Sequence, residues 1–444
     1  MTEQASPRRR REVIDALRRG TVPASGLDLL AIGLDRFTPA LDADLDTAEQ
    51  GGSAFKAVRG EYGSGKTFLT RYVGERALRR GFAAAEVQIS ETQTPLHRLE
   101  TVYRRITEAL RTAAYPPSAF RMVLDSWFYT LESDSVTAEP ALATASQDQI
   151  SVAVTRLLEQ RLTQVSRQTP AFAQALRAYQ TAVRAGDAAT ADALAAWLGG
   201  QPNVAAAARR SAGIRGDLDH FAAMGFLQGL LTVLRDAGHP GLLLVLDEVE
   251  TLQRVRGDVR DKAFNALRQL VDEIDSGRYP GLFLIITGTA AFYDGPSGIS
   301  RLPPLAQRLA TDFATDSRFD NPRAAQLRLP GFDRAALTAL GVRVRDLYAA
   351  GAADPGRIRS VVDDDYLTSL ADAVAGSLGG KAGIAPRLFL KKLVADVLDR
   401  VDQFADFDPR HHYALTLRQS EMTDEERNAM PQAASADDID IELP

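Results

Sequence analysis

Cysteine is absent from the 444-residue sequence, and histidine is scarce, with only five residues. Without thiols the chain can form no disulfide and no thiolate metal site, and it has no cysteine nucleophile. No HExxH or comparable spacing links the histidines, so a structural metal site is not expected. These absences exclude disulfide-stapled domains, zinc ribbons and cysteine hydrolases.

Long apolar runs are also missing. None approaches the ~20 residues that a bilayer crossing needs. The first residues, MTEQASPRRRR, are basic but lack the apolar segment of a secretory signal. With 45% hydrophobic and 25% charged residues, the composition is typical of a soluble globular protein. We therefore expect a cytoplasmic protein.

An overall excess of positive charge is lacking too, since the formal net charge is −6. This argues against nucleic acid binding over the whole surface, although a local basic patch is compatible with it. Two segments are candidates. Arg8–Arg11 is either a nucleic-acid arm or a solubilising disordered end, and 253–262 (QRVRGDVRDK) is either a phosphate-backbone contact or a solvated loop of interleaved charges. DNA is therefore a candidate partner.

What the sequence does contain is an alternation of short apolar runs and helical patterns. The continuous runs at 241–248 and 281–289 are typical of strands covered on both faces. Weaker strand signals occur at 53–60, 82–90 and 324–332. Because helical spacing separates these runs, the sequence predicts an α/β fold with a five-stranded parallel sheet and helices on both faces.

Composition divides the chain into four parts. We expect an N-terminal arm and adenine-side segment at 1–52, the α/β core at 53–332, a small helical domain at 333–415 and an acidic tail at 416–444. Within the core, the stretch at about 116–220 is alanine-rich and helical, and its segment 185–210 (AGDAATADALAAWLGGQPNVAAAARR) has helix propensity but few large apolar residues. We interpret it as a helical insertion that packs loosely on the core.

A complete phosphate-binding motif lies between the first strand and the following helix. Gly60–Thr67 (GEYGSGKT) fits G-x-x-x-x-G-K-[ST] without mismatch. Glycines let backbone N–H groups converge on phosphate oxygens, and the helix N-terminus favours negative charge. Lys66 is predicted to contact the β- and γ-phosphates and Thr67 to hold Mg²⁺; the alternative is a glycine turn with a solvated lysine. We expect the cofactors ATP and Mg²⁺, with the nucleotide bound by Gly60, Glu61, Tyr62, Gly63, Ser64, Gly65, Lys66, Thr67 and Phe68.

Two acids end the third strand, Asp247 and Glu248. In open α/β sheets ligands bind at the carboxyl ends of strands. We interpret Asp247 as a Mg²⁺ ligand, partly through water, and Glu248 as the general base for an attacking water. The alternative is a pair of solvated strand-end acids. Thr287 and Thr289 end the next strand, and either one would orient that water or satisfy strand-end backbone groups.

Several arginines follow the fourth strand. One that reaches a neighbouring subunit's γ-phosphate would stabilise transition-state charge, which predicts an ATP-dependent homo-oligomer. Any one of them is otherwise a surface residue. In the helical domain, Arg387 starts an apolar helix (PRLFLKKL) and either folds onto the phosphates or faces solvent. The candidates for such an arginine acting on a neighbouring subunit (an arginine finger) are Arg301, Arg308, Arg318 and Arg323, and Arg308 and Arg318 are the strongest.

Together these motifs resemble the AAA+ ATPases, within the origin-recognition-like branch of P-loop proteins. The stretches GEYGSGKTFL, LDEVETLQRVRGDVRDKAFNALRQLVDEID, ITGTAAFYDGP and GGKAGIAPRLFLKKLVADVLDRVDQF are similar to the BrxD family, ATP-binding proteins of BREX (bacteriophage exclusion) systems. The resemblance runs from about Arg9 to beyond Tyr413. It implies an AAA+ core with a C-terminal helical lid, and these functional residues: Walker A at Gly60–Thr67, Walker B at Asp247 and Glu248, one sensor at Thr287 or Thr289, and a second at Arg387.

The resemblance also implies a role in anti-phage defence, beside helicase, methyltransferase and phosphatase-like partners acting on DNA. We expect an ATPase whose nucleotide state assembles or remodels a DNA-associated complex. Two alternatives stay open: a nucleotide-dependent switch or scaffold with negligible turnover, and an origin-recognition-like DNA-binding loader. The intact Asp247–Glu248 pair favours hydrolysis.

Overall fold

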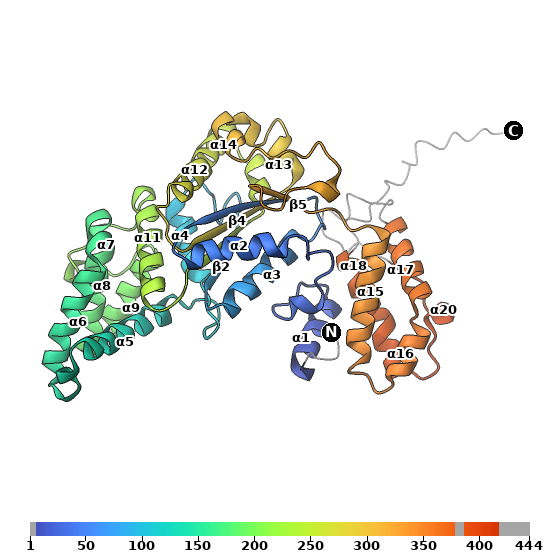
Figure 1. The fold of residues 1–444 in the computed structure, drawn as a ribbon, viewed down its shortest axis with the longest axis horizontal. Helices are drawn as coiled ribbons and strands as arrows, with labels where there is room; N and C mark the ends of the chain where they lie inside the picture. The colour runs from blue at the N-terminus through green and yellow to red at the C-terminus, as the bar shows by residue number, and fades with distance from the viewer. Residues whose placement is uncertain (1–5, 378–385, 417–444) are drawn as a thin grey trace. The chain divides into compact units, whose positions relative to one another are not determined.

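The computed structural model describes residues 6–377 and 386–416, which fall into two compact units (Figure 1). The first unit consists of Met1–Thr38, Arg59–Glu75 and Arg328–Pro444, and the second of Pro39–Val58 and Arg76–Leu327. The first unit contains the glycine-rich loop, and the second contains most of the sheet. Within the described ranges, no helix has both the length and the apolarity needed to cross a membrane.

The sheet has five strands in the order β2-β3-β4-β1-β5, and each lies inside its predicted range. The β2–β3 and β3–β4 pairs are parallel, in a register that places Gln88 beside Asp247. Every residue of β3 and β4 is buried, which explains their uninterrupted apolar sequences. The predicted α/β fold with a five-stranded parallel sheet is confirmed. The strands are β1 (Ala54–Arg59), β2 (Ala83–Gln88), β3 (Leu242–Asp247), β4 (Leu282–Gly288) and β5 (Gln326–Arg328).

Helices pack on this sheet through apolar stripes. In α4 (Leu99–Ala109), Leu99, Val102, Tyr103 and Ile106 are buried at helical spacing, and the helix packs against β2. The other helices of the core are α2 (Thr38–Glu49), α11 (His220–Asp236), η4 (Val249–Gln253), α12 (Gly257–Asp275), α13 (Ala290–Asp294), η5 (Ile299–Arg301), α14 (Pro303–Arg308) and η6 (Ser317–Phe319). Helix α3 (Lys66–Arg79) begins in the first unit, to which its residues up to Glu75 belong.

The alanine-rich stretch is helical as predicted, but the expectation that it packs loosely is wrong. Its helices lie beside α11 (Figure 1), and Trp127, Phe172 and Tyr179 have no exposed surface. They belong to the same hydrophobic core as β2, β3 and β4. Leucines of these helices, among them Leu124, Leu158 and Leu176, are buried in the same core, so the helices are closely packed. The helices are α5 (Phe120–Ala138), η3 (Pro140–Thr144), α6 (Gln147–Arg161), α7 (Thr163–Gln168), α8 (Pro170–Arg184), α9 (Ala188–Leu198) and α10 (Ala206–Ser211).

Removing one of these aromatic rings is expected to destabilise the second unit. Phe172 packs edge-to-face on Phe226, with ring centroids 5.0 Å apart. Phe172→Ala should lower the free energy of unfolding by about 3–5 kcal/mol, because it leaves a cavity in a close-packed core. Phe221→Ala is the matched control, since Phe221 is 89% exposed. Urea unfolding of both variants measures the difference, and equal midpoints would contradict the shared core.

In the first unit, the N-terminal segment and the C-terminal helices share one core. Val13 and Leu17 of α1 (Pro7–Arg19) pack with Val344, Phe389 and other apolar residues. Arg8–Arg11 lie in α1, whose N-cap is Ser6, so the alternative of a disordered end is wrong for them. The remaining elements are η2 (Leu27–Leu29), α15 (Arg334–Ala349), α16 (Pro355–Val361), α17 (Asp364–Ser377), α18 (Pro386–Lys391), the π-helical η8 (Lys392–Leu398), α19 (Asp399–Gln403) and α20 (Pro409–His412).

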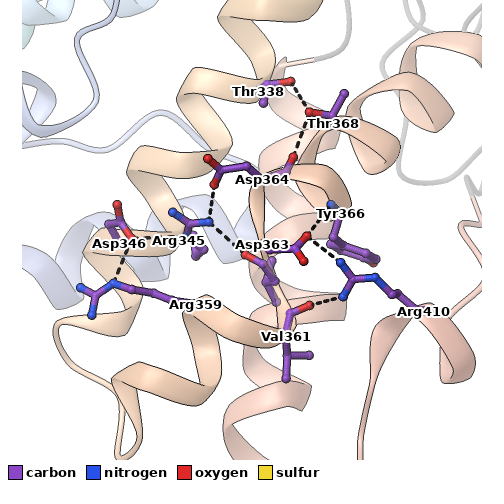
Figure 2. Close-up of polar contacts among 11 residues, drawn as sticks. Thr338, Arg345, Asp346, Arg359, Val361, Asp363, Asp364, Tyr366, Thr368 and Arg410 are labelled. Carbon is purple, nitrogen blue, oxygen red and sulfur yellow. Dashed lines mark hydrogen bonds and ion pairs between the residues drawn. The ribbon is translucent and has the colours of Figure 1, made fainter.

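A polar network joins the C-terminal helices of this unit (Figure 2). Arg345 of α15 donates to Asp364 at 2.6 Å. Arg410 of α20 donates to the carbonyl of Val361 at 2.8 Å and to the carboxylate of Asp363 at 2.6 Å. The backbone N–H of Tyr366 and the Arg410 bond lower the pKa of Asp363. These arginines and acids compensate one another in charge, so the network does not form a surface of one sign.

Candidate functional site

The glycine-rich loop continues directly from β1 into α3, and its conformation requires glycine. Gly63 and Gly65 have φ of +77° and +91°, a region that other residues rarely adopt. At Gly60 an added Cβ would lie 2.3 Å from Oγ of Ser64. Gly63 and Gly65 are therefore needed for the path of the backbone, and Gly60 for the close approach of the Ser64 side chain. The loop ends where Lys66 begins α3, so the N-terminus of a helix follows the loop directly.

Lys66 is held inside this loop. Its side chain is nearly buried, with the residue 8% exposed, and Nζ donates to the carbonyls of Gly60 at 2.8 Å and Glu61 at 3.3 Å. Nζ also lies 5.2 Å from the ring centroid of Tyr62. Among the described residues, the buried Oγ of Ser64 has no hydrogen-bond partner. The loop thus presents an ammonium group and an unsatisfied hydroxyl together, which suits an anionic ligand.

Two phenylalanines lie next to the loop. An added Cβ at Gly65 would lie 3.6 Å from the ring of Phe332 and 4.0 Å from Phe68. Both side chains are partly buried against the core of the first unit. Phe68 was predicted to contact nucleotide from its place in the motif. Phe332 was not, because nothing in the sequence distinguishes it from other residues that follow the fifth strand.

In the second unit, Asp247, Glu248 and Thr287 form one hydrogen-bonded group. Asp247 ends β3 and is 5% exposed. The N–H of Glu248 donates to Oδ1 of Asp247 and to Oγ1 of Thr287, each at 3.1 Å, and Thr287 also donates to Asp247. Thr287 is therefore the threonine that faces the acidic pair. Thr289 instead occupies the N-cap position of α13.

The backbone of Glu248 is in the left-handed region, with φ +59° and ψ +43°. In the described part of the chain, only Ser118 and Asn203 share a positive φ among non-glycine residues. Such a conformation costs roughly 1–3 kcal/mol and is often found at functional sites. Gln88, the last residue of β2, donates from Nε2 to Oε2 of Glu248 at 2.7 Å. Sequence reasoning missed Gln88, although its place at a strand end beside β3 was a usable signal.

The arginine candidates have different surroundings. Nε of Arg308 lies 2.9 Å from Asp272, and its Nη1 lies 3.4 Å from Asp275. The side chain of Arg318 is 73% exposed, with its guanidinium 4.6 Å from the ring of Phe319. Arg301 forms a long ion pair with Asp261, and the backbone N–H of Arg323 bonds to the side chain of Asn321. None of these contacts joins the acidic pair.

Arg387 is the second residue of α18 in the first unit. An added Cβ at Gly20, the C-cap of α1, would lie 3.4 Å from its Nη1. The preceding stretch 379–385 (GGKAGIA) lies outside the described residues, as does the acidic tail from 417 onward.

The phosphate-binding loop and the acidic pair follow two strands of the same sheet. The loop Gly60–Gly65 follows β1, the acidic pair ends β3, and Thr287 lies in β4, the strand between them in the sheet. Residues 5–417 match the sequence pattern of one protein family, described as BREX system ATP-binding protein BrxC/D. The chain belongs to this family. Among curated proteins, none matches the sequence.

Membership in the BrxC/D family covers nearly the whole chain, including the loop, the acidic pair and the C-terminal helices. The family is one of ATP-binding proteins, which agrees with a complete phosphate-binding motif between a strand and a helix. The sequence resemblance to BREX ATP-binding proteins is thus confirmed at the level of BrxC/D.

Proposed function

We propose that this BrxC/D protein binds ATP·Mg²⁺ and hydrolyses it as an AAA+ ATPase of the BrxD type. The observation that carries the proposal is the hydrogen-bonded group of Asp247, Glu248 and Thr287, on the same sheet whose β1 leads into the phosphate-binding loop. A loop alone supports binding, whereas an ordered pair of acids at a strand end supports hydrolysis.

The side chains of the loop and the pair suit this chemistry. Lys66 and the N–H groups at the start of α3 bind phosphate oxygens. The Thr67 hydroxyl and the Asp247 carboxylate are hard oxygen donors, as Mg²⁺ requires, and the ion would neutralise charge on the phosphates. Glu248 accepts a proton from the attacking water. Its backbone bonds and Gln88 hold its carboxylate in place.

Nucleotide state would then be communicated through Arg387 and the C-terminal helices, which act as an AAA+ lid. Of the finger candidates, Arg318 is the more available, because it is largely exposed while Arg308 is paired with two acids of α12. A finger acting in trans requires a homo-oligomer. In a BREX system, the nucleotide cycle would assemble or remodel a complex of defence proteins on DNA.

The purified chain is expected to hydrolyse ATP in a steady-state assay, with turnover falling to background when EDTA removes Mg²⁺. The assay is run with and without duplex DNA at about 0.1 M and about 0.2 M salt, because contacts between a protein and DNA phosphates weaken over this range of salt concentration. The mass in solution is measured with and without a slowly hydrolysed ATP analogue. A shift to an oligomer supports an arginine in trans.

A second candidate function is a nucleotide-dependent switch with negligible turnover. One observation favours it: the Glu248 carboxylate is hydrogen-bonded to Gln88, and a base held in this way is less available to water. A chain that binds ATP tightly, responds to it structurally and yet shows no Mg²⁺-dependent turnover would support the switch and contradict the ATPase. Stimulation of turnover by duplex DNA would favour the loader.

A further inference from the structure

Helix α1 is tied at its N-terminal end to the helix that carries Lys66. Glu75 of α3 accepts hydrogen bonds from Nη2 of Arg9 at 3.0 Å and from the N–H groups of Gly26 and Leu27 at 3.1 and 3.0 Å. Its carboxylate is largely buried. A single side chain of the phosphate-binding helix therefore fixes both α1 and the turn that follows it.

At its other end, α1 is tied to the helix that carries Arg387. Nε and Nη2 of Arg18 bind the two carboxylate oxygens of Asp399 at 2.6 and 2.9 Å, a bidentate geometry with strong orientational preference. The hydroxyl of Tyr348 also donates to Asp399 at 2.9 Å. Asp399 begins α19, which continues the helical run of α18 and η8 from Pro386.

The C-cap of α1 contacts the start of the same run. Gly20 adopts φ +72°, and an added Cβ would lie 3.2 Å from Cδ of Lys391 and 3.4 Å from Nη1 of Arg387. The guanidinium thus lies at the carbonyl end of α1, where a helix favours positive charge. Between Arg387 and Asp399, η8 is wound as a π-helix, a rare form that is frequent at functional sites.

We propose that α1 is a positioning element, which through Arg18, Gly20 and Arg9 holds the Arg387 helix in register with the phosphate-binding helix. Arg9 and Arg18 would then stabilise contacts within the protein instead of contacting nucleic acid. The inference rests on the proposed nucleotide-sensing role of Arg387. A purely structural role for Arg18 is the competing explanation. The Arg18 side chain is 38% exposed, and the more buried Asp399, at 13%, keeps its hydrogen bond from Tyr348 when Arg18 is removed, so the unit should stay folded.

A double-mutant cycle separates the two explanations. Arg18→Ala is expected to reduce kcat/KM for ATP by about three- to tenfold, in the lower part of the range of coupling between interacting residues. In an Arg387→Ala background, the same change should have no further effect, because the group that it positions is gone. Arg19→Ala is the matched control, an exposed arginine in the same turn of α1. Arg18→Lys keeps the charge but not the bidentate geometry, and should rescue in part.

Other results of the double-mutant cycle contradict the proposal, and each points to a different error in it. If the two effects multiply in the double variant, Arg18 acts independently of Arg387. If Arg387→Ala alone leaves kcat/KM unchanged while the wild type turns over ATP, the sensing role fails, and the positioning proposal fails with it. Absence of turnover in the wild type instead contradicts the ATPase itself. Should Arg18→Ala unfold, Asp399→Asn removes the ion pair with little change in shape and enters the same cycle.

Discussion

Replacing Lys66 by alanine is expected to abolish ATP binding in practice, raising Kd by about a hundredfold or more. The estimate follows from losing at least two charge-assisted hydrogen bonds to phosphate, each worth roughly 1.5–3 kcal/mol. The nearly buried position of Lys66 strengthens the effect, since its Nζ is held in the loop by the carbonyls of Gly60 and Glu61. Isothermal titration with ATP and with ADP measures the change.

Two controls make this result specific. Lys262→Ala is the same chemical change at an exposed lysine of α12 and should leave Kd unchanged. Because Lys66 also bonds to loop carbonyls, urea unfolding of Lys66→Ala must show that the first unit stays folded. An unaltered Kd in a folded Lys66→Ala variant would remove the phosphate-binding interpretation of Gly60–Thr67.

The fold was largely predictable because its strongest signals are local. The apolar runs of β3 and β4 reflect strands buried on both faces, and the glycines of the loop reflect φ values that other residues avoid. The packing of the alanine-rich helices was mispredicted because packing, unlike helix formation, has no local signal in the sequence. Propensity indicates helix, but how closely two helices approach depends on side chains distant in sequence, such as Phe172 and Phe226.

The residues that surround the site were predictable only in part. The acidic pair follows from its place at a strand end, but the choice between Thr287 and Thr289 depends on which side chain reaches Asp247. Gln88 meets Glu248 across 160 positions of sequence, and Arg18 meets Asp399 across 381. Such pairs arise from the register of strands and the docking of helices, which no spacing rule in a single sequence encodes.

Glu248→Gln is expected to separate binding from hydrolysis. Turnover should fall by about 10²–10⁴-fold, the usual contribution of a general base, while Kd for ATP changes little. The substitution preserves the length of the side chain. The backbone bonds from Glu248 N–H to Asp247 and Thr287 do not involve the carboxylate, so the arrangement around Asp247 should persist. Kd from titration and kcat from a steady-state phosphate-release assay are measured on the same preparation.

The control for this variant is Glu91→Gln, the same chemical change at an exposed residue shortly after β2. It should match the wild type in both measurements. Comparing the change in kcat with the change in Kd for ATP discriminates between an ATPase and a nucleotide-dependent switch. A large loss of kcat with Kd unchanged supports hydrolysis through Glu248. Wild-type turnover in Glu248→Gln assigns the base elsewhere, and a parallel loss of binding makes Glu248 part of the nucleotide contact rather than the base.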